Sequence, residues 1–266
     1  MKAIEIIRAT SNGRRPRRVR ALQERRMIEV KYRRAIVGLV RQIERDAFAQ
    51  FKSQSLVLDA VEDDFAAAFR NLRAIHLGTP DVITSVVRAF TNEAEEVHRQ
   101  RFFASLRNAF GIDLADIIEE EGLGETLLEA VNDNVNLITS VAEEYLDNIE
   151  QAVFQNLAGG GDGTPLLDVI RNVGDVSESR ARLIARDQNS KLNASLTQAR
   201  QEALGVEEYR WITSRDDRVR ETHRDNNGKI FKWSQRPRET GHPGEDIQCR
   251  CIACLLYTSP SPRDRG

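Results

Sequence analysis

Two histidines and two cysteines near the end of the sequence have the side chains that bind a transition metal. His223 and His242 flank a turn-rich stretch, and Cys249 and Cys251 follow as a Cys-x-Cys pair. Two imidazoles and two thiolates satisfy a tetrahedral zinc site, and a Cys-x-Cys pair can bind one ion from a single loop. These four residues are therefore predicted to hold one zinc ion that stabilises a small module. The alternative is that both histidines only form hydrogen bonds inside a loop-rich core.

Charged residues around these candidate ligands favour supporting roles. Asp216 or Asp246 is expected to orient a liganding histidine through its second ring nitrogen. Arg220 and Arg250 are expected to pair with carboxylates such as Asp216 rather than to catalyse a reaction.

The same stretch also allows an enzymatic interpretation. His223, Asn227 and His242 superficially resemble a His-Asn-His nuclease, in which one histidine activates water and a metal ion stabilises phosphate. Residues that would hold such a hairpin in a ββα arrangement are not evident in the sequence. A metal-dependent nuclease is therefore the alternative, and a non-enzymatic role is favoured.

Short strands are predicted to position the candidate ligands. Residues 208–213 alternate polar and bulky side chains, and residues 229–233 alternate again. Asn226-Asn227-Gly228 is a strong turn signal, and residues 241–244 form another tight loop. The sequence therefore predicts a small α+β module that rests on a long preceding helix.

Helical spacing of apolar residues dominates the rest of the chain. Thr79 is the expected N-cap of one helix, with Pro80 in its first turn, and Ser177 is the expected cap of the last long helix. The fold class is mainly α, with an extended helical N-terminal region followed by the small C-terminal α+β module. The predicted helices cover residues 21–51, 58–75, 80–110, 113–121, 125–157, 165–173 and 177–205.

Composition divides the chain into five predicted parts. These are a basic flexible arm over residues 1–20, a helical region over 21–158, a Gly-rich linker over 159–165, a C-terminal domain over 166–254 and a tail over 255–266. The tail resembles a translated sequencing-adapter read-through, with Cys254 at the join, and it is left out of the predicted fold. In that interpretation the natural sequence after Cys251 is different, whereas the alternative is a genuine Pro/Ser-rich tail.

Charge is strongly segregated although the formal net charge of the 266 residues is only -2. Residues 1–41 contain thirteen Lys and Arg against three Glu, and residues 108–170 contain no Lys or Arg. The basic arm is predicted to neutralise phosphates on DNA or RNA, or else to dock on an acidic protein. The candidate nucleic-acid contacts are Arg14, Arg15, Arg17, Arg18 and Arg20.

The remaining bulk features predict a soluble protein made in a cytoplasm. No apolar run approaches the length that crosses a bilayer, and the Arg-rich start lacks the apolar core of a secretion signal. All three cysteines lie in the last eighteen residues, which gives no disulfide framework. The carboxylates of the acidic segment are interpreted as a solvated face, because no calcium-binding loop is present.

Residues from about 177 to 251 resemble the phage Mu F-like minor head protein family, also called the head morphogenesis domain. The resemblance depends on the order and spacing of rare residue types. Beside the two histidines and two cysteines, the motif contains Trp211, Asp216, Arg220, Gly228, Asp246 and Arg250.

This resemblance implies a non-enzymatic component of the virion that is added to procapsids in few copies. It would act near the portal in head assembly or DNA delivery, in the host cytoplasm during assembly. The implied partners are the portal protein, capsid or scaffold proteins and non-specific DNA, without a membrane. A helical adaptor that binds acidic proteins is a third possibility.

Overall fold

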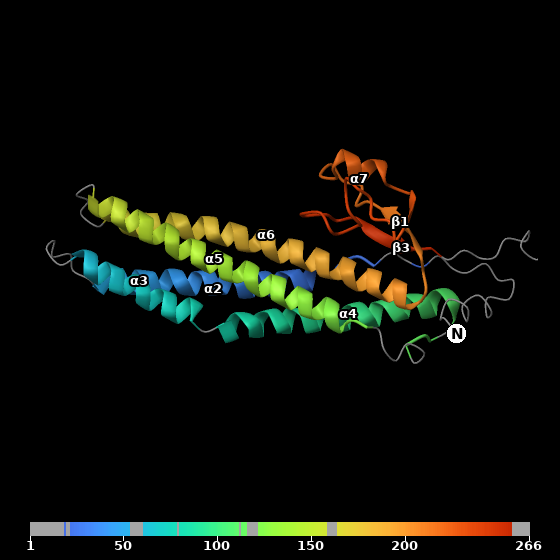
Figure 1. Cartoon of the computed structure of the whole chain (residues 1–266), viewed down its shortest axis with the longest axis horizontal. Helices are drawn as coiled ribbons and strands as arrows, with labels where there is room; N and C mark the ends of the chain where they lie inside the picture. The colour runs from blue at the N-terminus through green and yellow to red at the C-terminus, as the bar shows by residue number, and fades with distance from the viewer. Residues whose placement is uncertain are drawn as a thin grey trace, which may run out of the picture. The chain divides into compact units, whose positions relative to one another are not determined.

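The computed structural model describes residues 19, 22–53, 61–78, 80–111, 113–115, 122–158 and 164–256. Long helices dominate this part of the chain, and a small antiparallel sheet lies near its end (Figure 1). The predicted class, mainly α with a small C-terminal α+β module, is confirmed. The long helices are α2 (Arg26–Ser53), α3 (Val61–Leu77), α4 (Pro80–Phe110), α5 (Gly124–Ala158) and α6 (Thr164–Ala203).

Contacts divide the described residues into two compact units that do not follow the order of the sequence. The bundle unit comprises the described residues of Met27–Phe90 and Val131–Arg186. The C-terminal unit comprises those of Met1–Arg26, Thr91–Ala130 and Asp187–Gly266. Helices α4, α5 and α6 each contribute to both units, so this division differs from the linear one predicted around residues 159–165.

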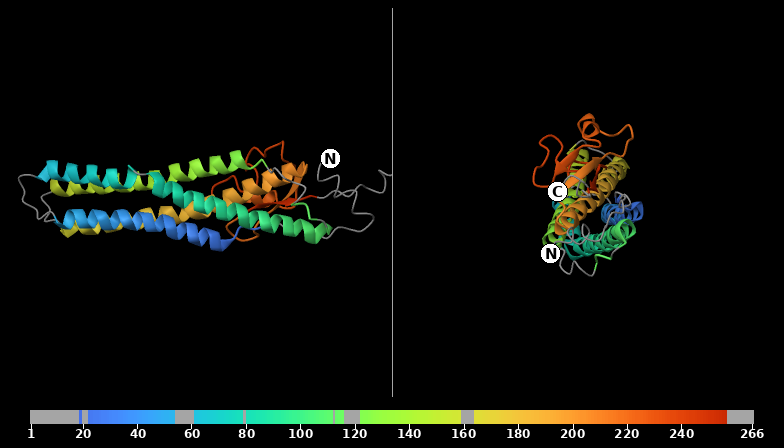
Figure 2. Two further views of the ribbon diagram at one scale, coloured as in Figure 1. Left: turned by 90° about the horizontal axis from the view of Figure 1, so that it is seen from below. Right: turned by 90° about the vertical axis from the view of Figure 1, so that its right-hand side faces the viewer.

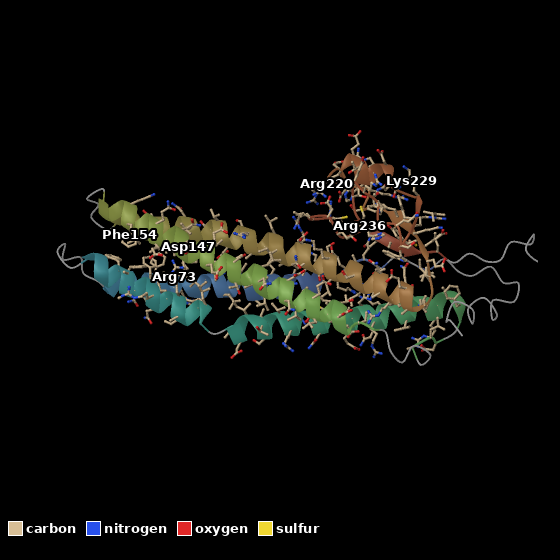
Figure 3. All side chains as sticks on the ribbon, viewed as in Figure 1. Arg73, Asp147, Phe154, Arg220, Lys229 and Arg236 are labelled. Carbon is tan, nitrogen blue, oxygen red and sulfur yellow. The ribbon has the colours of Figure 1, made fainter. Side chains whose placement is uncertain are left out.

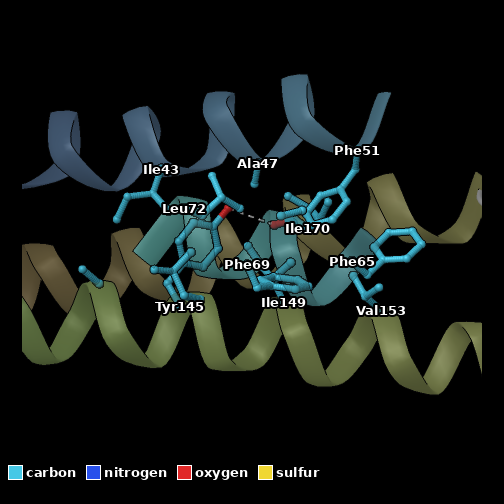
Figure 4. Close-up of a cluster of buried hydrophobic side chains, with 13 residues drawn as sticks. Ile43, Ala47, Phe51, Phe65, Phe69, Leu72, Tyr145, Ile149, Val153 and Ile170 are labelled. Atoms are coloured by element: carbon cyan, nitrogen blue, oxygen red, sulfur yellow. Dashed lines mark hydrogen bonds between the residues drawn. The ribbon is translucent and has the colours of Figure 1, made fainter. Parts of the chain in front are cut away.

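Apolar side chains at helical spacing build the core of the bundle unit. Phe51, Phe69 and Tyr145 pack in one cluster with residues of α2, α3, α5 and α6 (Figure 4). The hydroxyl of Tyr145 is buried and donates to the backbone oxygen of Ile170 at 3.3 Å. Figure 2 shows α2 beside α6 and α3 beside α5 in this unit. The buried residues of this cluster are the apolar stripes that the periodicity of the sequence predicts.

The ends of three predicted helices shift by at most three residues. The helices predicted over 58–75, 80–110 and 125–157 correspond to α3, α4 and α5. The stop predicted at Gly111 is confirmed, because its φ is 76° and its N–H donates to the oxygen of Arg107 at 2.8 Å. Helix α2 begins at Arg26 rather than near residue 21.

One predicted break in the helices is wrong. Helix α6 is continuous through Gly174 and Ser177, where the sequence predicts the end of a short helix and the cap of a long one. A Cβ at Gly174 would lie 3.3 Å from the Tyr145 hydroxyl and 3.3 Å from the Glu44 carboxyl carbon. Gly174 therefore allows close packing against α2 and α5, and Ser177 is buried within the helix.

Four further predictions fall partly or wholly outside the described residues. Of the helix predicted over 113–121, residues 113–115 are described and are not helical. Most of the Gly-rich linker and of the arm lies outside the described residues, and so does Thr79. Among the described residues, no helix combines the length and apolar character needed to span a membrane.

The end of α6 turns the chain into the sheet. Gly205 has a φ of 80°, its N–H donates to the oxygen of Glu202, and the N–H of Val206 donates to the oxygen of Gln201. This pair of bonds closes the helix in a left-handed cap for which glycine is suited. The chain then enters β1 (Glu208–Ile212) directly.

Strand β1 is the centre of a three-stranded antiparallel sheet with the order β2-β1-β3. Strand β2 (Ile230–Lys232) pairs Phe231 with Tyr209, and β3 (Ile252–Leu255) pairs Ala253 with Trp211. The first two strands are predicted from the alternation of the sequence. No strand is predicted over residues 252–255, and Leu255 is assigned to the tail, whereas in the structure it pairs with Tyr209 and is buried.

Candidate metal centre

Three of the four predicted ligands lie together in the C-terminal unit. His223 is on the short helix α7 (Glu221–Asp225), and Cys249 and Cys251 follow in the loop before β3. One ligand atom from each residue lies within 4.8 Å of the others, and all three side chains are buried. Nδ1 of His223 is 3.5 Å from the sulfur of Cys249 and 3.5 Å from that of Cys251.

Strand β1 forms the wall against which this cluster packs. Tyr209 and Trp211 point to the same face because side chains alternate along a strand, and both are fully buried. The ring of His223 meets Trp211 edge to face with centroids 5.5 Å apart. The two cysteines belong to the same apolar cluster as Trp211.

A carboxylate fixes the orientation of the His223 ring. Nε2 of His223 lies 3.1 Å from Oδ2 of Asp246, and a carboxylate only accepts, so in the neutral ring the proton lies on Nε2 and the unprotonated Nδ1 faces the two sulfurs. Arg220 donates to the same carboxylate oxygen at 2.7 Å and to the backbone oxygen of Ile247 at 2.7 Å. The carboxylate, the imidazole and the sulfurs therefore form one continuous chain of polar contacts.

Hydrogen bonds stabilise negative charge on Cys249. The thiol of Cys251 lowers the pKa of Cys249 most, and the N–H groups of Cys251 and Gly244, each 3.4 Å from the sulfur, add to the effect. The pKa of Cys249 falls to about 6. Donation to Cys249 and burial together raise the pKa of Cys251. Cys249 therefore loses its proton more readily than Cys251, which keeps its proton and donates it to the sulfur of Cys249.

The second half of α6 holds the ligand loop in place. Ser190 donates to the backbone oxygen of Cys249 at 2.6 Å, and the N–H of Gln248 donates to Asp187 at 2.5 Å. Gln248 has a φ of 57°, a left-handed conformation that costs free energy in a residue with a side chain. Sequence reasoning missed Asp187 and Ser190, because residues about sixty positions before the loop carry no recognisable motif.

His242 lies apart from this cluster. Its Nδ1 is 2.8 Å from the hydroxyl of Tyr209, and its ring packs on Trp233 with centroids 5.1 Å apart. Burial lowers the pKa of His242 most strongly. The two histidines thus contact different residues on the same face of β1, and only His223 faces the cysteines.

The other motif residues form structural contacts around the cluster. Arg250 pairs with Asp216 at 2.5 Å, and this pairing lowers the pKa of Asp216. Gly228 has a φ of 85°, and its N–H donates to the oxygen of Trp211 at 2.8 Å. These contacts attach the segment between β1 and β2 to the loop before β3 through Arg250 and to the central strand through Trp211.

Each residue of the nuclease interpretation contacts a different partner. Asn227 accepts hydrogen bonds from the N–H and the hydroxyl of Thr213 at 3.0 and 3.2 Å. His223 is engaged with Asp246, and His242 with Tyr209. The arm residues Arg14, Arg15, Arg17, Arg18 and Arg20 lie outside the described residues.

A second buried polar cluster in the same unit was not anticipated from the sequence. Arg200 is 1% exposed, and its guanidinium lies 2.6 Å from Nδ1 of His98 and 2.6 Å from Glu95. Nε2 of His98 lies 2.9 Å from the hydroxyl of Thr197. Burial and the neighbouring Arg200 lower the pKa of His98 to about 3. The ring is therefore neutral and accepts a hydrogen bond from Arg200.

Comparison with known proteins confirms the predicted resemblance. Residues 147–254 match the sequence model of the family described as Phage Mu protein F like protein. An uncharacterized protein of Haemophilus influenzae is 37% identical over 169 residues, which make up 63% of this chain and 38% of that protein. The chain thus spans less than half the length of this relative. No solved structure matches the chain.

Proposed function

We propose that this chain is a minor head protein of a bacteriophage that acts in head morphogenesis, since residues 147–254 carry a Phage Mu protein F-like domain. The family match is the observation that carries the proposal. It contains the whole ligand cluster and every motif residue from Trp211 to Arg250. The matching region is only part of the Haemophilus relative, so the role of the complete head protein is inferred from the domain.

A structural role agrees with how the chemically competent residues are used. Both cysteines of the cluster are at most 5% exposed, and the motif arginines are paired with carboxylates. In this proposal such contacts stabilise a surface that binds protein partners. In this proposal the chain joins the procapsid in few copies next to the portal in the host cytoplasm, remains in the virion, and has no catalytic step of its own.

Deletion of the gene from a phage that carries it tests the assembly role. Heads of the deletion mutant should be defective or non-infectious in electron micrographs and plaque assays, and the wild-type chain supplied from a plasmid should restore them. Mass spectrometry should detect the chain in purified procapsids at a small fraction of the major capsid protein. Normal, infectious heads without the chain would contradict the proposal.

Site-specific crosslinking tests the proposed portal contact. Lys229 and Arg236, which Figure 3 labels in the C-terminal module, are both exposed, so a photoreactive residue at either position does not disturb the core. Val176, which is 68% exposed on α6, is the matched position in the bundle unit. At least one of these positions should crosslink to portal peptides in procapsids. Crosslinks confined to the major capsid protein would place the chain elsewhere in the head.

A further inference from the structure

We propose that His223, Cys249 and Cys251 bind one zinc ion in a site completed by a solvent ligand. The spacing of the ligand atoms carries the proposal. With zinc about 2.3 Å from sulfur and about 2.0 Å from nitrogen, a tetrahedral angle separates the two ligand atoms by about 3.5 Å. Both observed distances from Nδ1 of His223 to sulfur are 3.5 Å.

The carboxylate of Asp246 holds the histidine in the orientation that a zinc ligand requires. Zinc binds the unprotonated nitrogen of a neutral imidazole, whose other nitrogen usually donates to a carboxylate or a carbonyl group. Asp246 receives that donor bond from Nε2 of His223 at 3.1 Å. Arg220 holds the carboxylate from the opposite side at 2.7 Å. The ring therefore has little freedom to turn its lone pair away from the sulfurs.

Donor groups converge on the two sulfurs. The N–H groups of Gly244 and Cys251 each lie 3.4 Å from the sulfur of Cys249. Nε1 of Trp211 is buried and has no hydrogen-bond partner, and Trp211 belongs to the same buried cluster as Cys251. A buried donor without a partner is unfavourable, and a metal-bound thiolate at Cys251 provides a strong acceptor for it.

The same chain of carboxylate, imidazole and thiol occurs in cysteine nucleophiles, but burial argues against that use. A nucleophile must be reached by its substrate. Cys249 is 3% exposed and His223 is 2% exposed. A metal ion needs only the interior space between the three ligand atoms. Within the described residues, no fourth histidine, cysteine or carboxylate belongs to the group, which leaves one position for solvent.

Zinc at this position would connect two segments that are separate in the sequence. His223 comes from α7, and the two cysteines come from the loop that leads into β3. The ion would therefore fix both segments against the Trp211 face of β1. This role is independent of the proposed head function, because a zinc-stabilised module can serve any partner surface.

The direct test is the metal content of the full chain purified without chelator. About one zinc per chain is expected, and cobalt exchanged into the site should give the visible spectrum of tetrahedral cobalt with thiolate ligands. The variants Cys249→Ser, Cys251→Ser and His223→Ala should each retain less than about one tenth of the zinc. A full chain that neither contains zinc nor binds it in competition with a chelating dye overturns the proposal.

Matched variants separate ligands from neighbours. Cys254→Ser, at a buried cysteine outside the cluster, and His242→Gln should keep the full zinc content. Loss of zinc in His242→Gln would overturn the three-residue set in favour of the four ligands expected from the sequence. Asp246→Asn leaves all ligands in place and should weaken zinc binding by about 10- to 100-fold. An unchanged affinity in Asp246→Asn, in a variant that remains folded by circular dichroism, would overturn the orienting role of Asp246.

Discussion

The imidazole of His98 is held neutral by the groups around it. Nδ1 accepts from Arg200 at 2.6 Å, and Nε2 faces the hydroxyl of Thr197, which itself donates to the backbone of Asn193. A proton added to Nδ1 would point at the guanidinium of Arg200. Protonation of His98 therefore requires this buried cluster to open.

We expect His98 to make the folded state sensitive to acid. Its pKa is about 3 in the folded state and about 6.5 when unfolded, so the unfolded state binds the extra proton. Stability is complete above pH 6.5 and falls as the pH drops toward 3, by about 2 kcal/mol at pH 5. Denaturant unfolding of wild type and His98→Gln from pH 7.5 to 4.5 measures this. Equal pH dependence in the two proteins would show that His98 titrates normally.

We expect the buried contact between Tyr209 and His242 to stabilise the C-terminal module. Tyr209→Phe removes the hydroxyl that lies 2.8 Å from Nδ1 of His242 and leaves a buried polar atom unpaired. The variant should lose about 1 to 3 kcal/mol of unfolding free energy. The double variant with His242→Phe should lose less than the sum of the two single changes. Simple additivity in this cycle would mean that the two side chains are not coupled.

Residue types alone were enough to identify the candidate ligands, but not to assign their partners. His223, Cys249 and Cys251 stand out because imidazole and thiolate bind zinc. Whether His223 or His242 faces the sulfurs depends on which aromatic residue of β1 each ring contacts. That choice is made by tertiary packing, so the sequence predicted four ligands where the structure brings three together.

The loop that carries Gly244 packs closely against α6. Gly244 has a φ of 95°, and a Cβ at this residue would lie 2.2 Å from the Cβ of Ala194. Gly244→Ala should therefore lose roughly 2 to 5 kcal/mol, from backbone strain and from overpacking. Thermal and denaturant unfolding measure the loss.

Gly228 provides the matched control for that loss. Its φ is 85°, but nothing lies within 4 Å of an added Cβ. Gly228→Ala should lose only about 1 to 2 kcal/mol from the left-handed backbone. Adding Ala194→Gly to Gly244→Ala should recover part of the larger loss. Equal losses at both glycines would mean that the loop does not approach α6 closely.

The helices show why periodicity succeeds and where it fails. Apolar spacing located α3, α4 and α5 because their buried stripes lie within each helix. The sequence predicts a break between residues 173 and 177, although Gly174 in this stretch lets Tyr145 and Glu44 approach a continuous α6. Strand β3 was missed because its partner, β1, lies about forty residues earlier. Contacts between distant segments leave no local pattern.

The basic arm gives a prediction about binding rather than stability. Val19 packs with the cluster around Leu106, so substitutions before it are preferable to deletion. Neutralising four arginines should weaken binding to duplex DNA at low salt and reduce the slope of log affinity against log salt by up to about 3 to 4. Fluorescence anisotropy at several salt concentrations measures both. The substitutions change Arg14, Arg15, Arg17 and Arg18 to Gln.

The same charge change elsewhere controls for total charge. Replacing four exposed arginines of the C-terminal module by Gln should change the slope less than the arm variant does. Equal effects would indicate a response to net charge, and no effect of the arm variant would favour docking on an acidic protein. The control positions are Arg215, Arg218, Arg224 and Arg238.

Across the whole molecule, the segregation of charge lets helices pair by sign. The acidic helix α5 carries no Lys or Arg, and arginines of the neighbouring helices α3 and α6 pair with its carboxylates. Arg73 of α3 contacts both Asp147 and Glu150, and Figure 3 shows Arg73 and Asp147 in the bundle unit. Arg180 of α6 contacts Glu144 in the same way. The net charge of -2 is therefore the sum of basic and acidic segments whose opposite charges pair in the folded chain.

Removing one of these cations should destabilise the bundle modestly. Arg73→Gln leaves Asp147 and Glu150 without their shared partner and should lose about 1 kcal/mol at low salt, less at high salt. Arg171 is the matched control, because its pair with Asp168 is more than 60% exposed on both sides. Arg171→Gln should change stability little. Similar losses for both variants at every salt concentration would argue against an electrostatic origin.

Part of the core of the C-terminal unit can form only late in synthesis, because it joins segments that are far apart in the sequence. Phe102 and Leu106 of α4 share a buried cluster with Leu204 and Leu255. At about 5 to 20 residues per second, the ribosome needs on the order of ten seconds or more to reach Leu255 after Leu106. Until then this apolar surface lacks its native contact with β3, while all residues of the bundle unit have been synthesised once the ribosome passes Arg186. A chaperone or an assembly partner has those seconds to reach the surface before β3 covers it.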